Sequence, residues 1–288
     1  MINKTLLLLS VVLSALIITQ AHSAQLVIII DDIGNNYERG NAMVELEGSL
    51  TLAFLPHTPY AKRLANKAYL QHKEIILHAP MENTVKAALG PGGLTQELTE
   101  IELKRTLKKA IASIPHTQGI NNHMGSALTQ NKQSMKWVME TLEDEQLYFV
   151  DSLTSAKSVA YQVAQQQGLP SLRRHVFLDN NKSLASLTQQ WQQALRIAKK
   201  HGSAVLIAHP YTESHDFLAQ KIPKLRDHNI QLVHASQLFL DRAWQAFDHQ
   251  KPHDIQYANR YRLKSEKTSK LASEPLNSQA TLVSKSAH

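Results

Sequence analysis

Short apolar runs alternate along the chain with longer segments in which apolar residues recur every three or four positions. The first run, residues 26–30 (LVIII), is apolar throughout, which is typical of a strand buried on both faces. Other short runs rich in apolar residues lie at residues 50–55, 74–77, 147–150, 175–178, 204–208 and 230–233, and residues 119–124 (GINNHM) are predicted to be a short strand that leads into a polar turn. Since each run precedes a periodic or polar segment, the pattern indicates alternating strands and helices and hence a parallel sheet.

The periodic segments predict helices at residues 37–47, 60–72, 99–114, 134–145, 156–167, 186–201, 213–228 and 237–247. Thr99 and Glu102 form a capping box, Ser134 is expected to cap its helix, and Gly202 is expected to end another. Pro223 is expected to bend the 213–228 helix. Residues 81–95, rich in glycine, are expected to form a long loop. This alternation fits one α/β domain, a closed or nearly closed barrel at residues 25–248.

Residues 1–24 are predicted to be a secretory signal peptide. Lys4 precedes an apolar stretch at residues 6–18, which is shorter than the roughly 20 residues of a membrane span. Ala21, Ser23 and Ala24 offer small side chains for cleavage, and an uncleaved N-terminal anchor is the alternative. We therefore expect export across the inner membrane into the periplasm, with no membrane span after signal removal.

The amino-acid composition restricts the kinds of metal and catalytic site that this chain could form. The chain has no cysteine, which excludes disulfides, thiolate metal sites and cysteine nucleophiles, so a metal would need His, Asp or Glu ligands. The net charge is +7, and residues 249–288 are predicted to be a disordered basic tail. No nucleic-acid-binding motif is present, so a basic surface outside the cytoplasm would meet anionic envelope polymers or lipid head groups, or simply be solvated.

Acidic residues and histidines follow the predicted strands. They are Asp31, Asp32, His78, His123, Asp151, Asp179 and His209. In a parallel barrel the carboxyl ends of all strands share one face. Two histidines and one carboxylate can hold a divalent ion, while a second carboxylate and another histidine can act as base and acid. These are the parts of metal-assisted hydrolysis.

Each of these residues also has a structural interpretation. Asp32 could cap the next helix, His78 and His209 could be packed core residues, and Asp179 could belong to a turn. The turn that contains His123 could exist for its backbone conformation alone. Other histidines are expected to be structural or exposed, namely His57, His72, His116, His201, His215, His228 and His249.

Seven segments carry a family resemblance. IIIDDIGNN, LAFLPHTPYA, ILHAPMEN, GINNHMGSALT, FVDSLTS, RHVFLDN and IAHPYTES together resemble the divergent polysaccharide deacetylases of the YibQ type, over residues 25–245. These are related to NodB-type carbohydrate esterases. The resemblance implies a distorted (β/α) barrel of about seven parallel strands and a metal, usually zinc, used to remove acetyl groups from sugars.

The resemblance also implies roles for individual residues. Asp31 matches the base and His209 the general acid, while Asp32, His78 and His123 match the metal ligands. The candidate residues of a substrate cleft are Asn122, Asp151 and Asp179. The chain departs from ordinary NodB-type enzymes, which take both histidine ligands from one H-S/T-x-x-H motif, because His78 and His123 are 45 positions apart.

Two functions follow as hypotheses. The first is a metal-dependent deacetylase, with zinc, acting on an acetylated envelope polysaccharide. The alternative is a catalytically silent deacetylase fold that binds a glycan or a partner in the envelope, which the missing histidine motif favours. A metal phosphoesterase is a weaker third option, since a second set of carboxylate ligands is absent. The oligomeric state is not indicated by any of these patterns.

Overall fold

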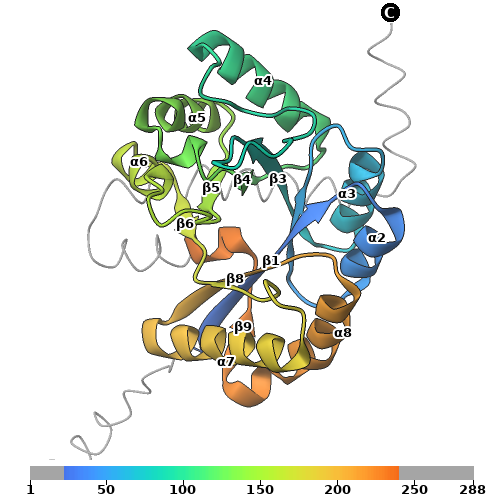
Figure 1. The fold of residues 1–288 in the computed structure, drawn as a ribbon. Coiled ribbons are helices and arrows are strands. Elements are labelled where there is room, and N and C mark those ends of the chain that lie inside the picture. The colour runs from blue at the N-terminus through green and yellow to red at the C-terminus, as the bar shows by residue number, and fades with distance from the viewer. Residues whose placement is uncertain (1–22, 240–288) are drawn as a thin grey trace, which may run out of the picture.

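Nine strands form one parallel sheet in the computed structural model, which describes residues 23–239 (Figure 1). They are β1 (Ala24–Ile33), β2 (Thr51–Phe54), β3 (Glu74–Met81), β4 (Gly119–Met124), β5 (Tyr148–Asp151), β6 (Ser171–Arg173), β7 (Val176–Phe177), β8 (Ser203–Ala208) and β9 (Ile230–Leu232). The order across the sheet is β6-β5-β4-β3-β2-β1-β8-β7, and β9 pairs with β1. The predicted parallel sheet is confirmed.

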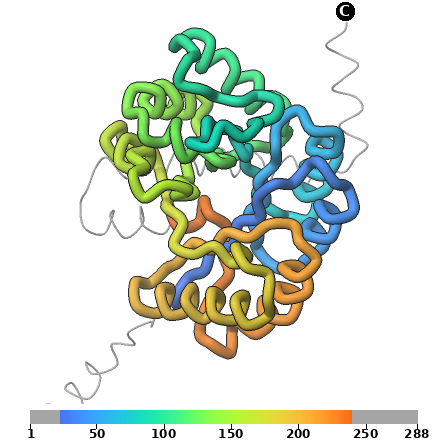
Figure 2. Tube along the Cα trace, in the orientation of Figure 1, coloured from blue at the N-terminus to red at the C-terminus, as the bar shows by residue number. Residues whose placement is uncertain are grey.

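The two ends of this sheet are joined by the chain itself. β6 and β7 lie at opposite ends of the strand order, yet only Arg174 and His175 separate them in sequence. The Arg174 N–H donates to the Asp151 carbonyl on β5, and the His175 N–H donates to the Val205 carbonyl on β8. β6 and β7 do not pair with each other within the described sheet, but the chain passes directly from one to the other, and its path round the barrel can be followed in Figure 2. This confirms the predicted distorted (β/α) barrel.

Helices surround the sheet (Figure 1). They are α2 (Tyr37–Glu45), α3 (Ala61–Leu70), α4 (Glu100–Ser113), α5 (Lys132–Asp144), α6 (Ala160–Gln166), α7 (Leu184–His201) and α8 (Thr212–Lys221), with 3-10 turns η1 (Leu128–Gln130), η2 (Ile222–Lys224) and η3 (Arg226–His228). Along β1, Leu26, Ile28 and Ile30 pack in the large apolar cluster that includes the helices. Val27 and Ile29 belong to a second, smaller cluster. Burial on both faces explains why this strand does not alternate.

Several predicted boundaries are wrong. α5 is capped by Asn131, whose Oδ1 accepts from the Ser134 N–H, rather than by Ser134. The predicted 213–228 helix ends at Lys221 and gives way to the turns η2 and η3, since Pro223 lacks the N–H that an α-helix needs. α6 begins at residue 160, not 156, and β6 was not anticipated.

Some predictions fall on residues outside the described range. The signal peptide (1–24) lies there except for its last two residues, and Ala24 pairs with Ile230 as the start of β1. The predicted tail (249–288) and most of the last helix also lie there, although residues 235–239 are helical. No helix within residues 23–239 has both the length and the apolar character needed to cross a membrane.

Glu74 caps the amino end of the last described helix, residues 235–239, with its carboxylate. Its buried carboxylate accepts from the N–H groups of Ala235 (2.8 Å) and Ser236 (3.2 Å), the first helical residues. The Thr51 hydroxyl donates to the same carboxylate at 2.7 Å. Leu238 of this helix packs in the smaller apolar cluster. Because Thr51 and Glu74 begin β2 and β3, this helix covers the amino end of the sheet and leaves the carboxyl end for a site.

Gly34 is required where β1 leaves the sheet. Its φ is +134°, and a Cβ there would lie 2.1 Å from the Thr58 hydroxyl oxygen. We expect Gly34→Ala to destabilise the fold by more than the roughly 1–3 kcal/mol of backbone strain alone. Gly90→Ala is the matched control, because Gly90 has φ +78° and no atom within 4 Å of the added Cβ. Equal losses in urea denaturation for the two variants would contradict this prediction.

Candidate metal centre

An irregularity in β1 brings two neighbouring carboxylates to one place. Ile30 pairs with Leu52 and Ile33 with Phe54, so β1 contains one more residue than β2 over this interval. Asp32 lies in this bulge with φ +59°. In a regular strand, Asp31 and Asp32 would point to opposite faces. The extra residue and the left-handed backbone let both side chains approach His78.

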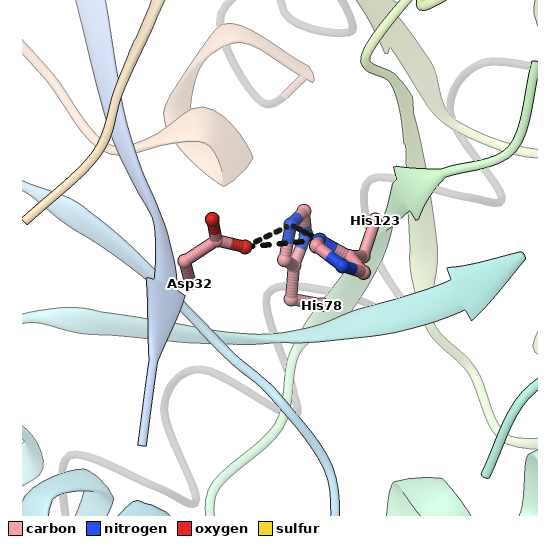
Figure 3. Close-up of side chains that lie close together, drawn as sticks. All are labelled: Asp32, His78 and His123. Carbon is pink, nitrogen blue, oxygen red and sulfur yellow. Dashed lines mark hydrogen bonds and ion pairs between the residues drawn. The ribbon is translucent and has the colours of Figure 1, made fainter. Parts of the chain in front are cut away.

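Asp32, His78 and His123 converge from three strands, β1, β3 and β4 (Figure 3). Asp32 Oδ1 lies 3.2 Å from His78 Nε2 and 2.9 Å from His123 Nδ1. The two ring nitrogens are 3.1 Å apart. His78 was expected at the end of its strand, whereas β3 continues to Met81. The three side chains nevertheless meet, as the sequence predicted.

This donor set fits a divalent ion. Two imidazole nitrogens and one carboxylate oxygen within 4.8 Å of one another can act as ligands, and tetrahedral zinc holds such atoms about 3.3 Å apart. Asp32 Oδ1 is buried and faces the two ring nitrogens, and a cation bound between these three atoms would compensate the buried negative charge. The Asp32 side chain is 33% exposed, so the centre is open on one side, as catalytic metal sites are.

A buried amide joins this cluster to Asp31. Asn121 Oδ1 lies 2.7 Å from His78 Nδ1, and Asn121 Nδ2 lies 2.7 Å from Asp31 Oδ1. Asp31 Oδ2 is 3.7 Å from His78 Nε2. Asp31 is therefore adjacent to the three-residue cluster but is not one of its members.

Burial and neighbouring charges shift the pKa values of Asp31 and Asp32 in opposite directions. Burial raises the pKa of Asp31, although His78 and His209 oppose this. Burial would also raise the pKa of Asp32, but His123 and His78 outweigh it and hold that pKa well below its usual range. Two neighbouring groups whose environments move their pKa values apart are suited to different roles. Asp32 remains anionic, and Asp31 is the better proton acceptor near neutral pH.

His209 follows β8 and is held by Asp179. Asp179 Oδ1 lies 2.8 Å from His209 Nδ1, and Asp179 Oδ2 accepts from the His209 N–H at 2.7 Å and from the Ser214 hydroxyl at 2.6 Å. Although burial lowers the pKa of His209, this hydrogen bond and the charge of Asp31 raise it to about 9. His209 is thus protonated at neutral pH, with Nε2 left for another partner.

Asp151 and Asn122, which were also predicted to line a substrate cleft, form hydrogen bonds with residues of nearby loops. Asp151 is fully buried, and its oxygens accept from the Leu153 N–H and the Ser158 hydroxyl. Asn122 accepts from the Ser152 N–H and donates to the Met124 carbonyl. Their roles toward a substrate stay predictions, and these contacts point instead to shaping the loops around the centre.

Sequence reasoning missed Asn121. Its signal was the alternation of β4, because Asn121 and His123 are two positions apart and therefore share a face. The histidines expected to be structural or exposed do not enter the three-residue cluster within residues 23–239, and His249 lies beyond those residues.

Comparison with known proteins places the chain in a family. The model of the divergent polysaccharide deacetylase family matches residues 28–239. The uncharacterized protein YibQ of Escherichia coli strain K12 is 35% identical over 216 residues, which cover 75% of this chain and 67% of YibQ. An uncharacterized protein of Haemophilus influenzae is 34% identical over 210 residues, which cover 73% of this chain and 75% of that protein.

A solved structure shares the fold. The crystal structure of an uncharacterized protein from Agrobacterium tumefaciens C58 matches with a TM-score of 0.73 and 22% identity, covering 76% of this chain and 91% of that one. The family match spans nearly all of the described barrel, including every residue of the candidate centre. The chain belongs to the divergent polysaccharide deacetylase family.

Proposed function

We propose that this protein is a metal-dependent deacetylase that hydrolyses N- or O-acetyl groups of an acetylated envelope polysaccharide. The convergence of Asp32, His78 and His123 carries the proposal, because it supplies a metal-ligating set next to Asp31, whose charge in turn acts on His209. Membership of a family described as polysaccharide deacetylases supports the substrate class. The predicted signal peptide supports a periplasmic location.

Zinc suits this donor set, and when bound it would polarise an acetyl carbonyl and lower the pKa of a water molecule. Asp31, with its raised pKa, accepts a proton from the attacking water. The water oxygen bonds to the acetyl carbon as the bond from that carbon to the sugar nitrogen or oxygen breaks. His209 Nε2 then donates a proton to the departing amine or alcohol, and acetate is released.

Asp179 prepares His209 for this step. By accepting from Nδ1, Asp179 leaves Nε2 as the ring nitrogen available to a substrate, and it stabilises the protonated ring. The Ser214 hydroxyl and the His209 N–H anchor the Asp179 carboxylate in turn. The general acid is therefore held by residues of the barrel and of α8.

Acetate release tests the proposal. Purified protein loaded with zinc should release acetate from N- or O-acetylated envelope glycans, because ligands, base and acid are all present. Treatment with a chelator should abolish release, and added zinc should restore it. If metal-replete protein releases no acetate above background from any of these glycans, the enzymatic proposal fails. Retention of that same protein on glycan would then support the binding alternative.

A further inference from the structure

Asn121 lies at the junction of the metal-ligand set and the base. It is fully buried on β4, paired directly with His78 of β3. Its side-chain oxygen faces His78 Nδ1 at 2.7 Å, while its nitrogen lies 2.7 Å from Asp31 Oδ1 and 3.3 Å from the Ser152 hydroxyl. The amide group thus has partners on both sides.

Elementary chemistry fixes the orientation of this amide. The NH₂ group of an asparagine can only donate, and here it faces two acceptors, the Asp31 Oδ1 and the Ser152 hydroxyl oxygen. The amide oxygen is then turned toward His78, where it can only accept. In the neutral ring that can bind a metal, the proton of His78 is therefore on Nδ1, and Nε2, which lies near Asp32 and His123, is the nitrogen that would ligate the cation.

We infer that Asn121 is a positioning residue, which selects the metal-binding tautomer of His78 and turns the Asp31 carboxylate toward the centre. Its second role rests on the proposed function, whereas its first concerns metal binding alone. A partner on the distal ring nitrogen orients a metal-bound histidine, and its loss typically weakens metal affinity about 10–100-fold.

The hydrogen bonds of Asn121 link the separate strands that carry the metal ligands. His78 and His123 belong to β3 and β4 rather than to one helix, so a single rigid element does not set their spacing. Asn121 shares β4 with His123 and bonds to His78 on β3. One amide thereby ties both histidine-bearing strands to the carboxylate of β1.

Two substitutions separate the two roles. Asn121→Leu keeps the approximate volume but removes both contacts, and we expect it to weaken zinc binding about 10–100-fold. Asn121→Asp keeps an acceptor for His78 Nδ1 but opposes Asp31 with a second carboxylate. We expect it to bind zinc as wild type does while its kcat for acetate release falls about 10²-fold.

Zinc affinity is measured by competition with a chelator, and the ring nitrogen shifts of His78 are read in the zinc-loaded protein by ¹⁵N NMR. Wild type and Asn121→Asp should show the proton on Nδ1.

Asn83→Leu is the control for lost stability, because Asn83 is also buried but bonds to the loop residue Ala87. It should lower the melting temperature and leave zinc affinity unchanged.

These measurements distinguish failure of the proposed function from failure of the role inferred for Asn121. If wild type binds zinc but releases no acetate, the proposed function fails, and the affinity and NMR measurements still decide the role of Asn121. If Asn121→Leu binds zinc as tightly as wild type, the inference is wrong. Should that variant fail to fold, Asn121→Ala provides the same measurement. Zinc binding absent from wild type overturns both proposals.

Discussion

Alanine at His78 or His123 is expected to abolish metal binding and, with it, acetate release. Each ring contributes one of three converging ligand atoms, so its loss leaves two ligands and should lower zinc affinity by at least about 10²-fold. His78 is 2% exposed, and its removal also leaves the Asn121 oxygen without its partner. Elemental analysis of the purified variants measures the metal content directly.

His215→Ala is the matched control for these variants. His215 Nδ1 pairs with the exposed Asp216 on α8 and lies outside the three-residue cluster. Its loss should leave metal content and acetate release at wild-type levels. If wild type, both cluster variants and this control hold equal metal, or if none holds any, then the assignment of ligands is incorrect.

The strands that could be predicted from the sequence are those that are buried on both faces. β1 and β8 contain continuous apolar runs, and each of them is buried and paired with a strand on both sides. β7 falls within the predicted strand at residues 175–178, whereas β6 escaped prediction because it is only three residues long and ends at Arg173, so that no apolar run marks it. The cap of α5 was misplaced because Ser134 and Asn131 are both good capping residues, and the sequence does not rank them.

Convergence of the candidate site followed from topology. Parallel strands place their carboxyl ends at one face, so residues far apart in sequence could be expected to meet there. The bulge that lets both Asp31 and Asp32 approach His78 depends on pairing with β2, which local sequence does not encode. Asp151 has the same position after an apolar run as the others, but its loop captures both oxygens.

Asp31→Asn is expected to retain zinc and lose turnover. The amide oxygen of the new side chain can still accept from Asn121 Nδ2, so the geometry that Asp31 now has is preserved. It cannot accept a proton from water, and loss of a general base typically costs about 10²–10⁴-fold in kcat. Since burial raises the pKa of Asp31, removing its charge should not lower the melting temperature.

The contrast with Asp32→Asn makes this prediction specific. Asp32 belongs to the ligand cluster, and its strongly lowered pKa shows how much the two histidines favour a negative charge there. Asp32→Asn should therefore lose zinc and acetate release together, whereas Asp31→Asn should lose only the second. Two adjacent residues of one bulge would then have separable functions. Wild-type acetate release by Asp31→Asn would require that another group accept the proton, and the proposed division between ligand and base would fail.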